Sequence, residues 1–136
     1  MEQNVDQEHL KLISIFHYIV GGILVLFACI PLIHFCIGIA IMSGIFAESN
    51  NANQAPPAFF GLIFAVMGGV FFVVGQALAW SIIYSGKQIK KRANYMFSFI
   101  VACVMCMFMP FGTILGIFTI IILSKESVKQ LYEKTI

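Results

Sequence analysis

The chain has 136 residues, of which 60% are hydrophobic and only 10% are charged, and its formal net charge is +2. Soluble domains carry about 25% charged residues, so this composition excludes an ordinary soluble globular protein, whose surface would be left largely apolar. The small net charge gives no indication of a nucleic-acid partner.

The positions of the charged residues indicate a membrane protein. Residues 12–46, 57–86 and 93–124 contain no Asp, Glu, Lys or Arg, and all eight Lys and Arg residues lie outside these segments. A lipid bilayer is the solvent that accepts such long uncharged segments. We therefore predict an all-α, polytopic membrane helical bundle that forms one transmembrane domain over residues 1–136.

The first apolar segment, residues 12–46, follows an acidic start that carries Glu2, Asp6 and Glu8. A secretory signal has a basic start, a shorter apolar core and a cleavage site of small residues, so we expect this segment to stay in the mature protein. Pro31 lies near its middle and predicts a kink in one long, tilted helix that crosses the bilayer once.

Two histidines in this segment, His17 and His34, are of a type that binds haem and transition metals. They lie 17 residues apart, which is about 25 Å along one helix, so they cannot bind one ion together. We predict no metal and no cofactor. We expect His34 to form a hydrogen bond with a carbonyl group that the kink at Pro31 leaves free.

The second segment, residues 57–86, predicts a single crossing that begins outside, after a loop at residues 48–56 without Lys or Arg. Trp80 and Tyr84 lie near its end, and aromatic residues followed by basic ones are typical of a cytoplasmic exit. We expect the basic cluster that follows to contact lipid headgroups, at about 1 kcal/mol per residue near the surface. The cluster consists of Lys87, Lys90, Lys91 and Arg92.

The third segment, residues 93–124, has Pro110 and Gly112 in its middle. Proline removes a backbone donor and glycine accepts conformations that end helices, so the pair predicts a hairpin of two short spans, residues 93–109 and 111–124. This gives four transmembrane helices with both termini in the cytoplasm, since every Lys and Arg then lies on the inner face. The alternative is one kinked helix, which gives three long helices and places the tail outside.

The tail, residues 125–136, places Val128, Leu131 and Tyr132 at helical spacing. This pattern predicts a short amphipathic helix on the inner leaflet, with its lysines facing the headgroups. A solvated, frayed end is the alternative.

Small residues recur at four-residue spacing in the predicted helices. They are Gly61, Ala65 and Gly69; Gly75 and Ala79; Ala40 and Gly44; and Gly112 and Gly116. In lipid, helices associate by close backbone approach, which such residues permit, and polar side chains such as Gln76 bridge helices by hydrogen bonds. We expect a compact bundle, or docking onto the helices of a partner protein or of a second copy.

Cys103 and Cys106 form a C-x-x-C pair, which on a helix places two sulfur atoms on nearly one face. The spacing is similar to that in quinone-linked disulfide-generating enzymes, which also place a C-x-x-C pair in a four-helix membrane bundle. Those enzymes need a second, shuttling cysteine pair outside the membrane, and this chain has no cysteine in a predicted loop. Simple packing by the two thiols is the other interpretation.

Two parts of the chain resemble a group of small, uncharacterised bacterial multi-span inner-membrane proteins. They are the start, Glu8–Val20 with Cys29–His34, and the end, Pro110–Leu123 with Ser124–Tyr132. The resemblance implies a multi-span protein of the bacterial inner membrane, and it carries no known activity or functional residues.

No catalytic constellation is evident, so we expect an accessory, structural or interaction subunit rather than an enzyme. Coupled transporters usually carry a carboxylate within the membrane, and the apolar segments have none. The alternatives are a membrane thiol-redox protein that uses Cys103 and Cys106, and a small homo-oligomeric channel lined by Gln76 and threonines.

Overall fold

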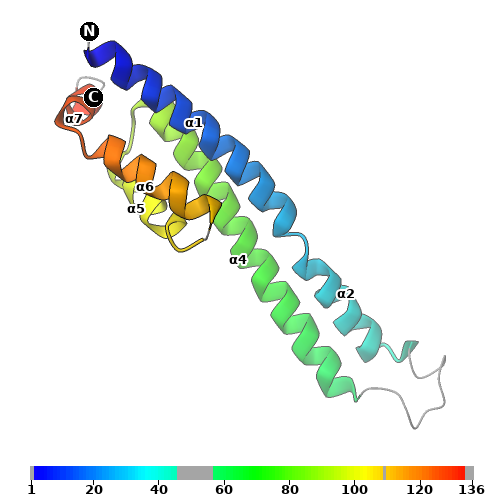
Figure 1. Ribbon diagram of the computed structural model, residues 1–136. Helices are drawn as coiled ribbons and strands as arrows, with labels where there is room; N and C mark the ends of the chain where they lie inside the picture. Colours follow the sequence, from blue (N-terminus) through cyan, green and yellow to red (C-terminus); the bar gives the residue numbers. More distant parts are fainter. Residues whose placement is uncertain (1, 46–56, 109, 134–136) are drawn as a thin grey trace. The chain divides into compact units, whose positions relative to one another are not determined.

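The computed structural model describes residues 2–45, 57–108 and 110–133, and within these ranges it has helices and no strand (Figure 1). The predicted all-α class is confirmed. The helices are α1 (Glu2–Phe27), α2 (Pro31–Met42), α4 (Ala58–Lys91), α5 (Tyr95–Met105), α6 (Phe111–Leu123) and α7 (Glu126–Glu133). The predicted outer loop at residues 48–56 lies outside the described residues.

Two stretches of helix are long and apolar enough to cross a membrane. They are Asn4–Met42, which joins α1 and α2, and Ala58–Lys91, which is α4. The apolar helices α5 and α6 have 11 and 13 residues. At about 1.5 Å per residue they extend about 17 and 20 Å, against a hydrocarbon core of about 30 Å.

The first apolar segment contains two helices, where the sequence predicted one kinked helix. α1 begins at Glu2, before the apolar residues, and ends at Phe27, and α2 begins at Pro31. The connecting turn is held by backbone hydrogen bonds between residues three apart, such as Ile30 N–H to the Phe27 carbonyl oxygen. Proline at the first position of a helix loses no hydrogen bond, because that N–H has no partner within the helix. Pro31 therefore starts a helix.

The chain divides into two compact units. The first contains Met1–Ile23 and Ala79–Ile136, and the second contains Leu24–Leu78. α1 and α4 each contribute residues to both units.

In the unit Leu24–Leu78, small residues of α4 contact α2 and the turn that precedes it, in antiparallel order. The contacts pair Ala28 with Gly75, Phe35 with Gly68, and Gly38 with both Gly61 and Ala65. A methyl group at Gly38 would lie 2.4 Å from the Ala65 backbone nitrogen and 2.6 Å from the Gly61 carbonyl oxygen. Glycine is therefore required for this close approach, as is typical of helix pairs in lipid.

The contact residues of α4 follow a heptad pattern. Gly61, Ala65, Gly68 and Gly75 are separated by four, three and seven residues. The sequence predicted Gly69 at the third position, but a Cβ there would lie 3.5 Å from the Phe35 ring, an ordinary contact. The period is therefore 3.5 residues, which keeps one face of a helix against its neighbour over several turns.

In the unit formed by Met1–Ile23 and Ala79–Ile136, α1 contacts α4 in antiparallel order. A Cβ at Gly86 would lie 2.9 Å from the His17 Cβ, and a Cβ at Gly21 would lie 3.4 Å from the Ala79 carbonyl oxygen. Ser14 Oγ donates a hydrogen bond to the Gly86 carbonyl oxygen at 2.7 Å. Figure 1 shows the start of α1 beside the end of α4.

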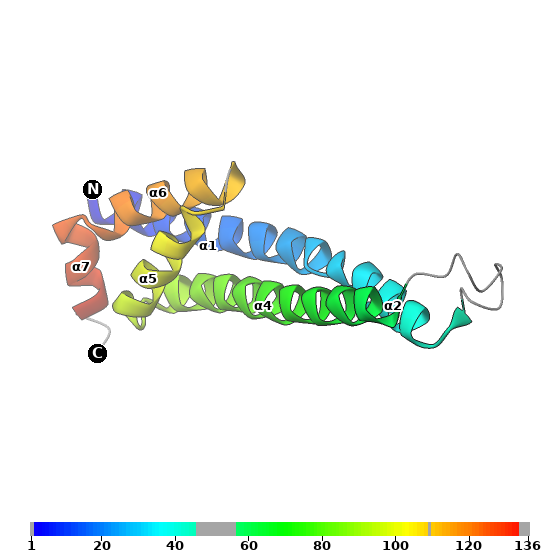
Figure 2. The ribbon, with the colours of Figure 1, turned by 90° about the horizontal axis from the view of Figure 1, so that it is seen from below.

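α5 and α6 form an antiparallel hairpin, as Pro110 and Gly112 predicted, and they are not one kinked helix (Figures 1 and 2). A Cβ at Gly112 would lie 2.6 Å from the Met105 carbonyl oxygen, so α6 packs closely on the end of α5. Thr113 Oγ1 donates to the Cys106 carbonyl oxygen at 2.9 Å and closes the turn. The sequence therefore places the break correctly.

Candidate functional site

A hydrophobic core joins the start of α1 and the ends of α4 and α6 to α7. Its buried members are Leu10, Ile13, Ile89, Leu123, Val128, Leu131 and Tyr132. The amphipathic helix predicted in the tail is confirmed. Its apolar face packs on the protein itself, whereas the sequence predicted contact with the inner leaflet.

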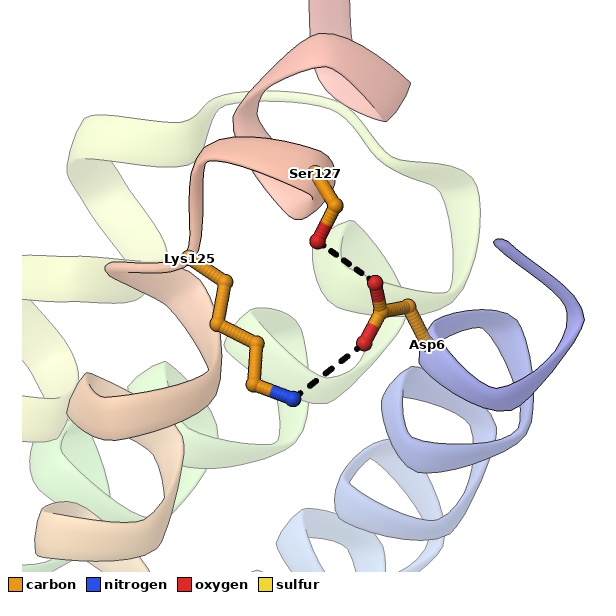
Figure 3. A network of polar contacts seen from close by, with 3 residues as sticks. All are labelled: Asp6, Lys125 and Ser127. Atoms are coloured by element: carbon orange, nitrogen blue, oxygen red, sulfur yellow. Dashed lines mark hydrogen bonds and ion pairs between the residues drawn. The ribbon is translucent and has the colours of Figure 1, made fainter. Parts of the chain in front are cut away.

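Asp6 links α1 to the start of α7 (Figure 3). Ser127 Oγ donates to Asp6 Oδ2 at 2.6 Å, and Lys125 Nζ donates to Asp6 Oδ1 at 3.3 Å. Asp6 is buried, with only 4% of its surface exposed. The hydrogen bond from Ser127 holds the pKa of Asp6 below its ordinary value of 3.8; burial opposes this effect, and Lys125 adds to it. The carboxylate is therefore charged at neutral pH.

We predict that acid weakens the docking of α7. The folded-state pKa of Asp6 lies below 3.8, so its link stabilises fully above that value and is lost as the pH falls through the folded pKa. Hydrogen exchange of residues 126–133, corrected for the intrinsic rate, should rise by about fivefold, corresponding to about 1 kcal/mol. Asp6→Asn should show the rise already at neutral pH. An equal acid-induced rise in that variant would contradict the role of Asp6.

Tyr132 anchors α7 from within this core. Its ring packs edge-to-face on Tyr95, with ring centroids 5.6 Å apart, and the Tyr95 hydroxyl donates to the Leu123 carbonyl oxygen at 3.1 Å. Burial raises the pKa of Tyr132 to about 12. Its hydroxyl has no hydrogen-bond partner among the residues that the structure describes. Tyr132 therefore stays neutral and serves packing rather than acid–base chemistry.

A groove of about 500 Å³ lies between the start of α1 and the end of α4. Leu10 and Ile89, which are 3% and 1% exposed, form its apolar floor. Polar groups on its sides come from Asn4, Gln7, Glu8, Lys11, Lys90 and Arg92. The α1 members are spaced by three, one and three residues, which places them on one helical face.

Only two of the four residues that were predicted to contact lipid headgroups line the groove. Lys90 and Arg92 line the groove, whereas Lys87 and Lys91 are exposed outside it. Lys11 is far from these four residues in the sequence, and the structure brings it into the same groove.

Polar side chains are also buried deeper in this unit, among them His17, Ser85 and Ser98, each 0% exposed. His17 Nδ1 lies 3.0 Å from the Ile13 carbonyl oxygen. Within the described ranges, His17 Nε2 and the hydroxyls of Ser85 and Ser98 have no hydrogen-bond partner. Among the described residues, no group of three His, Cys, Asp or Glu side chains is placed so that it could hold a metal ion.

The predicted redox pair lies at the end of α5. Cys103 is exposed and Cys106 is half-buried, and both are free thiols. Cys106 Sγ donates to the Ala102 carbonyl oxygen at 3.3 Å, and it lies 2.7 Å from where a Cβ on Gly116 would stand. This arrangement is that of a thiol packed between two helices.

The other predicted structural residues lie in the unit Leu24–Leu78. Gln76 Nε2 donates to the Val25 carbonyl oxygen at 3.3 Å and so bridges α4 to α1. His34 stacks on Phe64 with ring centroids 6.0 Å apart. Contrary to the prediction, His34 forms no hydrogen bond to a carbonyl near Pro31 in the described structure.

Sequence reasoning missed the link from Asp6 to Ser127 and the groove around Lys11. The link joins residues 121 positions apart, so no pattern in the local sequence predicts it. The groove had a weak signal, since Asn4, Gln7 and Lys11 share one helical face. Comparison with protein-family models, with curated proteins and with solved structures finds no match to the chain.

Proposed function

We propose that the chain is an integral protein of the bacterial inner membrane that works as an accessory or structural subunit. The main support for this proposal is the distribution of residue sizes around α4. Small residues fill its contact with α1 and α2, while Phe59, Val73 and Trp80 are 65%, 64% and 62% exposed. An apolar surface of this kind suits lipid or another membrane helix. The bacterial location rests on the resemblance described above.

In the proposed topology both termini and the basic cluster at residues 87–92 lie in the cytoplasm, following the excess of Lys and Arg in inner loops. The stretch α1–α2 and the helix α4 each cross once. The α5–α6 hairpin then enters from the cytoplasmic face and returns to it. Because its helices are about 17 and 20 Å long, we propose that its tip remains in the membrane. Four crossings would require local thinning of the bilayer.

A cysteine at the hairpin tip tests this topology. Met107 is 82% exposed, and Met107→Cys would be made in a chain whose four native cysteines are replaced by alanine. We expect a membrane-impermeant maleimide to leave it unlabelled in intact cells. Labelling from the periplasm would establish four crossings instead. Asn94→Cys is the cytoplasmic control and should react only after the cells are opened.

Photo-cross-linking from the exposed face of α4 tests the subunit role. A photo-reactive residue at Phe59 or Val73 should give the same discrete protein adduct in cells. The control position is Ala65, which is 7% exposed and contacts Gly38, and it should give no such adduct. Adducts with lipid alone at both exposed positions would contradict a subunit role without contradicting membrane insertion.

A further inference from the structure

Arg92 occupies a backbone position that usually belongs to glycine. The Ala93 N–H donates to the Gln88 carbonyl oxygen at 3.0 Å, and the Arg92 N–H donates to the Ile89 carbonyl oxygen at 3.2 Å. This pair of hydrogen bonds is the Schellman motif, in which the last residue adopts a left-handed conformation. Arg92 has φ 52°, where a side chain with a Cβ is strained. Strain at a defined position points to a function for the side chain.

The Arg92 side chain lines the groove, where it joins Lys90 and Lys11. In the part of the chain that the structure describes, none of the three forms an ion pair within 4.0 Å, although Glu8 lies in the same lining. The lining therefore carries three cations against one carboxylate, and like charges gathered along one groove repel one another. A bound anion removes this repulsion.

We propose that this groove binds a phosphate-bearing anion through Lys11, Lys90 and Arg92. The guanidinium group presents paired N–H donors that match two phosphate oxygens, and the lysines supply point charges. The side-chain amides of Asn4 and Gln7 add neutral donors along the same wall. The volume of about 500 Å³ falls within the range of about 300–1,000 Å³ that is typical of small-molecule sites. It accommodates the phosphate together with the group that bears it.

Two classes of molecule supply a phosphate group to such a site. Lys11 directly precedes one uncharged segment and Lys90 follows another by four residues, so the proposed membrane location places the groove at headgroup level. There an acidic phospholipid supplies the phosphate. The other source is a soluble phosphate ester from the cytoplasm. The binding chemistry is the same for both, and only the phospholipid source rests on the proposed membrane location.

A simpler role for these residues makes a different prediction. Basic residues in the last turn of a helix compensate the partial negative charge of its C-terminus, and α4 ends with Lys90 and Lys91. Inner-face basic residues also attract acidic lipids without a defined site. Under that role Lys90 and Lys91 are equivalent, because they are adjacent, exposed and equally charged. Under the proposal, loss of the Lys90 charge weakens anion binding, whereas loss of the Lys91 charge has little effect on it.

The test measures binding of phosphatidylglycerol to the full chain in detergent by native mass spectrometry. Lys11→Gln, Lys90→Gln and Arg92→Gly should each raise the apparent Kd by about fivefold, the effect of one basic charge. Lys91→Gln should change it less than about twofold. Glu8→Gln should lower it, because a repelling carboxylate is removed. Equal weakening by Lys90→Gln and Lys91→Gln, or no binding by the unaltered chain, would overturn the proposal.

Arg92→Gly separates loss of binding from loss of folding. Glycine adopts φ 52° without strain, so the variant should keep or raise its thermal unfolding temperature while it binds more weakly. A lower unfolding temperature together with unchanged binding would contradict the argument from strain.

Competition identifies the source of the phosphate. If soluble glycerol phosphate displaces the lipid from the unaltered chain but not from Lys90→Gln, the groove accepts free phosphate esters. If it does not compete, the lipid itself is the ligand. Release of the protein from membranes by alkaline carbonate would contradict the proposed membrane location, and it would leave binding in detergent unaffected.

Discussion

Alanine at Gly68 should force α4 away from α2, whereas alanine at the neighbouring Gly69 should be tolerated. A Cβ at Gly68 would lie 2.6 Å from the Phe35 backbone nitrogen and 2.7 Å from the Pro31 carbonyl oxygen. Both are backbone atoms, so no rotamer change relieves the overlap. A Cβ at Gly69 would lie 3.5 Å from the Phe35 ring, an ordinary contact. The two positions are adjacent in one helix and undergo the same chemical change.

We expect Gly68→Ala to lower the free energy of unfolding by about 1–3 kcal/mol, the usual cost of overpacking. Gly69→Ala should leave it unchanged or raise it by up to about 1 kcal/mol, since alanine favours the helix over glycine. Unfolding by SDS in mild detergent, followed by circular dichroism, measures both. Gly22→Ala in α1 is a second control, because apart from the neighbouring backbone of its own helix no atom lies within 4 Å of its Cβ position.

Equal stabilities of Gly68→Ala and Gly69→Ala would contradict the heptad contact. A larger loss in Gly69→Ala would restore the stripe of Gly61, Ala65 and Gly69 predicted from the sequence. The experiment therefore decides whether the contact residues of α4 repeat about every 3.5 residues or every four residues.

The difference between those periods explains what the sequence could and could not show. Gly, Ala and Gly at four-residue spacing correctly indicated close helix packing. The four-residue spacing of Gly61, Ala65 and Gly69 suggested Gly69, but at 3.6 residues per turn position 68 lies about 20° around the helix from Gly61 and position 69 about 80°. Two helices that stay in contact over several turns require a period of 3.5, and that places Gly68 in the contact. Helical geometry therefore favours Gly68 over Gly69 as the next residue on this face, and only the choice of face depends on the partner helix.

Local chemistry was predictable where one residue decides the backbone. Pro110 and Gly112 placed the break between α5 and α6 correctly, because proline and glycine act on the chain around them. Pro31 also marked a break, although it starts α2 instead of bending one helix. The conformation of Arg92 was not predictable, since arginine has no preference for positive φ. The contacts of Asp6 with Lys125 and Ser127 depend on the tertiary fold.

Aspartate at Val128 should release α7 from the fold, whereas aspartate at Gln130 should leave it docked. Val128 is 0% exposed within the core that joins α1, α4, α6 and α7. An unpaired carboxylate in an apolar site costs several kcal/mol. Gln130 is exposed on the same helix, so the same negative charge there remains in solvent. The pair separates the effect of burial from that of charge.

The released segment should also lose its helical structure. α7 has 8 residues, and isolated helices shorter than about 12 residues are marginal in water. Hydrogen exchange of residues 126–133 should therefore accelerate on the order of a hundredfold in Val128→Asp, which corresponds to about 3 kcal/mol of lost docking. Exchange in the unit Leu24–Leu78 should stay unchanged, because none of the core residues around Val128 belongs to it. Unchanged exchange of residues 126–133 in Val128→Asp would show that the α7 core does not hold the tail.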